Sequence, residues 1–131
     1  MNGDELIADL IGKPFLDGGR GPKEYDCFGL LEEVYRRRGI MLPTEENPLS
    51  LSDKAVAIGA AVERGEWEKV LEPVPYCAVA FRVIPPYITH VGIVLEDCQR
   101  FLHTRQGVNV AIEKLNSIAW RSRIAGFYIH V

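Results

Sequence analysis

The sequence of 131 residues has little cysteine, and its arrangement suits neither crosslinks nor metal ions. There are three cysteines, an odd number, and no two of them have CxxC spacing. This argues against a disulfide framework and against a zinc knuckle. We therefore expect a chain made in a reducing compartment, with no metal and no cofactor.

An excess of basic charge is also missing. Fifteen lysines and arginines face 18 acidic residues, which gives a net charge of -3. Nucleic acid is therefore a poor candidate for a partner, because proteins that bind it usually carry a basic patch.

Long apolar runs are missing as well. The first ten residues contain Asp4, Glu5 and Asp9 and have no continuous apolar stretch. This pattern predicts neither a signal peptide nor a membrane anchor. We expect synthesis in the cytoplasm and no membrane span, so that any action outside a cell requires delivery by something else.

The composition that remains is that of a globular protein. The chain is 47% hydrophobic and 25% charged. At this length it can bury one sizeable core and has no room for a second domain. We therefore predict a single domain over residues 1–131.

A cysteine stands where a loop rich in glycine and proline turns into an amphipathic helix. Apolar residues fall at helical spacing over residues 27–38, Asp26 is a good N-cap, and Gly39 ends the helix. Cys27 then lies in the first turn, where backbone N–H groups and the helix dipole favour a thiolate. This position suits a nucleophile, although a buried cysteine without chemistry is the alternative for Cys27 taken alone.

Helices are expected mainly in the first half of the chain. A short helix over residues 4–11 ends at Gly12, and the loop over residues 13–23 leads to the cysteine helix. Its glycines allow the backbone to bend close to the site. Ser52 caps a further helix that extends to Val62, and residue 67 and residues 70–75 form a connector.

The second half of the chain has the period of two that is typical of strands. We predict strands over residues 77–84, 90–95, 100–104, 108–112 and 124–131. Their close spacing indicates an antiparallel meander. The sequence therefore predicts an α+β fold, with helices packed on one face of an antiparallel sheet.

Two histidines lie on neighbouring predicted strands. His90 opens one strand and His103 closes the next, and a hairpin turn over residues 96–99 makes them cross-strand neighbours that can share a face. For each histidine alone a structural role is the simpler interpretation. Together with Cys27, they supply a nucleophile, a base and a group that orients the base.

These residues resemble a known family, the NlpC/P60 cysteine peptidases, which are papain-like hydrolases of bacterial cell-wall stem peptides. The resemblance extends over residues 10–128. It rests on Gly18-Gly19, Asp26-Cys27-x-Gly29-Leu30, His90-Val91-Gly92-Ile93 and Phe101-Leu102-His103. The stretches 14–22, 39–43 and 124–128 are similar to those of the phage-tail branch.

The resemblance implies a catalytic role for three residues. Cys27 is the expected nucleophile, His90 the general base and acid, and His103 the residue that orients His90. Asp26, Phe28 and Gly92 are the expected substrate-binding residues, with Phe28 also packing under the site. The implied substrate is the peptidoglycan stem peptide, cut between the side-chain carboxyl of D-glutamate and a diamino acid.

Two aromatic residues depart from the pattern of many cell-wall members. Those members have serine after the cysteine and a tyrosine in the loop before it, whereas this chain has Phe28 and Phe15. The absent hydroxyls bear on rate and on substrate preference.

The leading hypothesis is a peptidoglycan endopeptidase assembled into a phage tail or related injection particle, with phage tail proteins as partners. The alternative is a tail assembly or tip component that uses the peptidase fold as a binding module. A third possibility is an amidase or acyltransferase on the same fold.

Overall fold

The computed structural model describes residues 3–42, 64–83 and 88–131. The helix expected between Ser52 and Val62 lies outside these residues. In the part of the chain that is described, no helix has the length and apolar character needed to cross a membrane.

The helices of the described chain are short and lie before the sheet in the sequence. Helix α1 spans Gly3–Ile7 and continues as the 3₁₀ turn η1, Ala8–Leu10. Helix α2 spans Cys27–Arg37, as the sequence predicts to within one residue. Its apolar face is buried, and Gly39 follows it with a positive φ of 82°.

Six antiparallel strands form one sheet in the described residues, in the order β1-β6-β2-β3-β4-β5. The strands are β1 (Trp67–Val70), β2 (Ala78–Phe81), β3 (His90–Val94), β4 (Arg100–Arg105), β5 (Val108–Lys114) and β6 (Ile124–His130). The 3₁₀ turn η2, Arg121–Arg123, leads into β6. The α+β class is confirmed, and each of the five predicted strands matches an observed strand, although β2 ends at Phe81. The predicted meander holds for β2 to β5 and is wrong for β6, which pairs with β2 and β1.

The prediction of a connector at residue 67 and residues 70–75 is wrong for its first residues, which form a strand. Residues Trp67–Val70 form β1, and Trp67 pairs with His130 while Val70 pairs with Phe127. The partner strand lies at the far end of the chain, and β1 is an edge strand with the charged pair Glu68 and Lys69 at its centre. Local alternation of apolar residues, the signal used for the other strands, is therefore absent.

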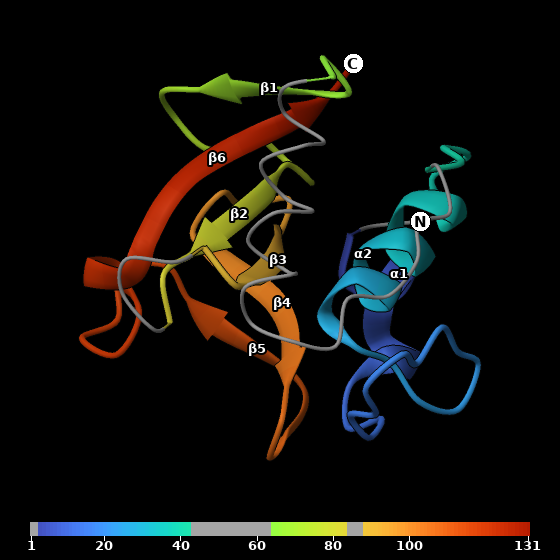
Figure 1. The fold of residues 1–131 in the computed structure, drawn as a ribbon. Helices are drawn as coiled ribbons and strands as arrows, with labels where there is room; N and C mark the ends of the chain where they lie inside the picture. The colour runs from blue at the N-terminus through green and yellow to red at the C-terminus, as the bar shows by residue number, and fades with distance from the viewer. Residues whose placement is uncertain (1–2, 43–63, 84–87) are drawn as a thin grey trace.

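The helices lie together on one side of the sheet, as Figure 1 shows, and α2 packs against β3 and β4. Alternate residues of these strands belong to two core clusters. Ile93 and Leu102 pack in the cluster that contains α2, whereas Val94 and Phe101 pack in a second cluster with Trp120.

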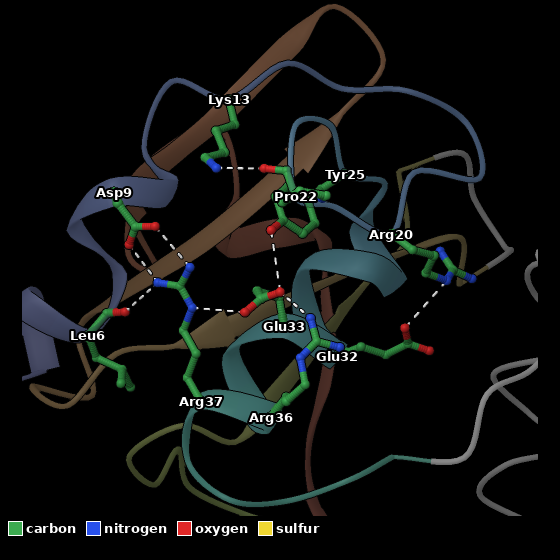
Figure 2. Close-up of polar contacts among 10 residues, drawn as sticks. All are labelled: Leu6, Asp9, Lys13, Arg20, Pro22, Tyr25, Glu32, Glu33, Arg36 and Arg37. Carbon is green, nitrogen blue, oxygen red and sulfur yellow. Dashed lines mark hydrogen bonds and ion pairs between the residues drawn. The ribbon is translucent and has the colours of Figure 1, made fainter.

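Hydrogen bonds attach the N-terminal segment both to α2 and to the sheet. The guanidinium of Arg37 donates to the carbonyl of Leu6 at 2.8 Å and to the carboxylate of Asp9 at 2.6 Å, as Figure 2 shows. Beyond η1, Gly12 N–H donates to the carbonyl of Val110 at 2.8 Å, and Val110 N–H donates to the carbonyl of Lys13 at 2.9 Å. These bonds attach the loop before the cysteine helix to β5.

Candidate active site

Cys27 is the first residue of α2 and is 3% exposed. Asp26 is the N-cap, and its carboxylate accepts a hydrogen bond from Gly29 N–H at 2.6 Å. This is the capping interaction that a carboxylate makes with the first turn of a helix. The start of the helix, and with it the cysteine, is therefore fixed by local chemistry.

The Asp26 carboxylate has further partners in the loop that leads to α2. It accepts hydrogen bonds from Gly18 N–H at 3.2 Å and from the Arg20 guanidinium at 2.6 Å, and the residue is 1% exposed. Arg20 also lies 3.4 Å from the carboxylate of Glu32 on α2, a contact drawn in Figure 2. Asp26 thus joins loop and helix, and its contact with substrate remains a prediction.

Glycine is required where this loop crosses the helix. A Cβ at Gly29 would lie 2.1 Å from the carbonyl oxygen of Gly19. A Cβ at Gly19 would itself lie 2.9 Å from the carbonyl oxygens of Leu16 and Glu24. The expectation that the loop glycines bring the backbone close to the site is confirmed.

His90 and His103 meet on one face of the sheet. The Nε2 atom of His90 lies 2.9 Å from the Nδ1 atom of His103, and both residues are almost fully buried. The ring of Trp120 packs against both imidazoles, with centroid distances of 5.7 and 4.9 Å. The expectation that the two histidines are cross-strand neighbours on a shared face is confirmed.

Gly92 and Phe28 have packing roles around these groups. A Cβ at Gly92 would lie 3.0 Å from the carbonyl oxygen of Leu102 and 3.4 Å from the Cβ of His103. Gly92 therefore lets β4 and its histidine approach closely. Phe28 is half-buried and packs on the core under α2, as expected. The substrate contacts of both residues remain predictions.

Glu113 on β5 is a member of this cluster that the sequence analysis missed. Its carboxylate contacts the Nε2 atom of His103, while its side chain is 36% exposed. In the hairpin of β4 and β5, His103 pairs with Ala111, so Glu113 lies two residues along on the same face. The turn at residues 106–107 was the signal from which this register could have been found.

The electrostatics of His103 are those of a neutral buried ring. Burial lowers the pKa of His103 below its usual value, and the nearby charge of Arg105 acts in the same direction, whereas Glu113 opposes the shift.

The two cysteines other than Cys27 lie elsewhere in the fold. Burial raises the pKa of Cys77, which packs in the second core cluster, and Cys98 is half-buried in a turn.

The described elements therefore bring together His90, His103 and Glu113 and set α2, which begins with Cys27, against β3 and β4. The approach of the Cys27 sulfur to the His90 ring remains a prediction. Within residues 3–42, 64–83 and 88–131, no group of three or more His, Cys, Asp or Glu residues could hold a metal ion.

Two solved structures with the same fold come from chains that are longer than this one. An NLP/P60 family protein from Staphylococcus aureus, described as similar to a lipoprotein, is 26% identical with a TM-score of 0.68, covering 98% of this chain and 39% of that one. An NlpC/P60 family protein from Bacillus cereus is 21% identical with a TM-score of 0.70, covering 99% and 40%. The chain thus spans about two fifths of these two structures.

One structural relative has the same extent as this chain. The NlpC/p60 domain of the peptidoglycan hydrolase SagA is 20% identical, with a TM-score of 0.60 and full coverage of both chains. No curated protein matches the chain. The family model described as "NlpC/P60 family" matches residues 12–128. Because that match takes in nearly the whole sequence, the chain belongs to the NlpC/P60 family.

Proposed function

We propose that the chain is a cysteine peptidase that hydrolyses the stem peptides of peptidoglycan. The observation that carries the proposal is the contact between His90 and His103, in an NlpC/P60 chain whose cysteine begins the helix packed on the same strands. The name of a structural relative, the peptidoglycan hydrolase SagA, supports the choice of substrate.

In this proposal His90 takes the proton of the Cys27 thiol, and the sulfur attacks the carbonyl carbon of the scissile bond. The tetrahedral intermediate carries a negative oxygen, which the backbone N–H of Cys27 helps to stabilise. His90 then gives its proton to the leaving amine, and a thioester remains. Water attacks the thioester with His90 again as base, which releases the carboxylate product and restores the thiol.

The finer points of the proposal rest on the sequence pattern. The bond cut is that between the side-chain carboxyl of D-glutamate and a diamino acid, with Asp26, Phe28 and Gly92 near the substrate. The similarity of stretches 14–22, 39–43 and 124–128 to the phage-tail branch supports delivery by a phage tail or related particle. Detection of the chain in purified particles by mass spectrometry tests this delivery.

Replacement of the nucleophile is the direct test of the proposed activity. We expect Cys27→Ala to abolish cleavage of a purified stem tetrapeptide, because no other group in the mechanism can form the thioester. The measurement is mass spectrometry of muropeptides after digestion, which also identifies the bond that is cut.

Cys98→Ala is the matched control, since it removes a thiol from a turn outside the site. It should cleave like the wild type, and circular dichroism should show both variants folded. The proposal fails if the wild-type chain cuts no stem peptide, or if Cys27→Ala still does so.

A further inference from the structure

We propose that Glu113 is a positioning residue that fixes the protons of both imidazoles, so that His90 directs an unprotonated Nδ1 toward the nucleophile. The catalytic consequence rests on the proposed function, whereas the proton arrangement itself follows from contacts among Glu113, His103 and His90. No sequence pattern named above includes Glu113.

The three side chains form a continuous chain of contacts across three neighbouring strands. The Glu113 carboxylate on β5 meets Nε2 of His103 on β4, and Nδ1 of His103 lies 2.9 Å from Nε2 of His90 on β3. Both nitrogens of His103 and Nε2 of His90 therefore face a partner within this set of side chains. Whether one nitrogen carries a proton therefore determines whether the nitrogen that faces it carries one.

A carboxylate accepts hydrogen bonds and cannot donate them, and this sets the direction of the hydrogen bonds among the three side chains. Nε2 of His103 must carry a proton to donate to Glu113. In a neutral imidazole only one nitrogen carries a proton, so Nδ1 of His103 is an acceptor. Nε2 of His90 must then donate to it, which leaves Nδ1 of His90 as the basic atom of that ring.

The competing arrangement has a doubly protonated His103. That ring would donate at both nitrogens, so Nε2 of His90 would become the acceptor and Nδ1 would hold the proton, which is wrong for a base. Glu113 raises the pKa of His103 and so favours this state, but burial and the charge of Arg105 lower the pKa by more, so that the neutral ring is preferred. The buried surroundings of the rings thus support the assignment made by Glu113.

Glu113 lies between the buried imidazole of His103 and solvent. It lines a cavity of about 400 Å³, together with Arg105, Trp120 and Arg123. His103 is fully buried under Trp120, whereas the Glu113 side chain is 36% exposed. The carboxylate is therefore within reach of water while it contacts a ring that solvent does not reach.

The proton positions can be read directly by ¹⁵N NMR of the histidine side chains in the full-length chain. At about pH 8, well above the ordinary pKa of histidine, we expect His103 to be the single Nε2–H tautomer in the wild type. We expect the same tautomer for His90 in Cys27→Ala, where no thiol can give its proton to Nδ1 of His90. In Glu113→Gln the amide can donate or accept, so the ¹⁵N shifts of His103 should move toward a mixture of tautomers. Glu68→Gln, the same change on an exposed residue of β1, should leave both rings as in the wild type.

Kinetics supply the second measurement. We expect Glu113→Gln to lower kcat by roughly 10- to 100-fold with little change in KM, since a wrong tautomer removes the base and leaves substrate binding intact. Nδ1–H on His103 in the wild type, Nδ1–H on His90 in Cys27→Ala, unchanged shifts in Glu113→Gln, or unchanged kcat would each overturn the assignment. If the wild type cuts no stem peptide, the proposed function fails, but the NMR comparison still decides the role of Glu113.

Discussion

At the scale of single residues, the site depends on positions where no side chain fits. Gly29 lies in the first turn of the cysteine helix, and the carbonyl of Gly19 occupies the space where its Cβ would stand. Gly39 differs, because it has a positive φ of 82° and a Cβ there would meet nothing within 4 Å. A comparison of the two glycines therefore separates the effect of a steric clash from the effect of a left-handed backbone conformation.

We expect Gly29→Ala to lower the free energy of unfolding by about 3 kcal/mol, because loop and helix must move apart. Gly39→Ala should lower it by only about 1 kcal/mol, from the left-handed conformation alone. Urea unfolding of the two variants checks the difference. Equal losses of stability in the two variants would mean that the loop at Gly19 moves away from residue 29 at no cost in free energy.

At the scale of elements, the start of α2 is held by one carboxylate that serves both helix and loop. Asp26 caps the helix through Gly29 N–H and binds Gly18 N–H and Arg20 in the loop. Its side chain is 2% exposed, whereas that of Arg20 is 27% exposed. Loss of Asp26 therefore removes a cap and leaves a partly buried cation without its nearest anion.

Asp26→Ala should lower the free energy of unfolding by about 2–4 kcal/mol, the sum of a lost cap and a broken ion pair. Asp26→Asn should lose less, because its side-chain oxygen can still accept from Gly29 N–H. A double-mutant cycle with Arg20→Ala measures the ion pair. Additive losses would show that Arg20 contributes nothing through Asp26.

Elements with a local signal could be predicted from the sequence, and an element or contact without one could not. The cap and the apolar spacing gave α2 to within one residue, and the two histidines followed from a hairpin between adjacent strands. Strand β1 was missed because Glu68 and Lys69 occupy its centre and leave no alternation of apolar residues. Glu113 was missed because its contact with His103 needs the register of a second hairpin as well.

At the scale of the whole molecule, the buried histidine couples folding to pH. The pKa of His103 is lower in the folded chain than in the unfolded chain, chiefly through burial. As pH falls below the ordinary histidine value of about 6.5, the unfolded chain therefore takes up the proton first. Stability is fully present above that value and decreases as pH falls toward the lower pKa of the folded state.

We expect the free energy of unfolding to decrease between about pH 7.5 and about pH 5.5, before most carboxylates are protonated. His103→Asn should show a smaller decrease over this range, whatever its stability at neutral pH. Leu102→Ala, which changes a buried apolar neighbour on β4 and removes no titrating group, is the control and should keep the wild-type slope. Chemical unfolding at several pH values measures the slopes, and equal slopes for His103→Asn and the wild type would refute the coupling.

The attachment of the N-terminal loop to β5 has a consequence for how copies of the molecule meet. Val110 has both of its main-chain groups engaged by Gly12 and Lys13, so a foreign strand cannot add to the sheet at that point. At the opposite border of the described sheet, β1 presents the exposed charges of Glu68 and Lys69. Both borders therefore discourage the edge-to-edge growth through which sheets polymerise.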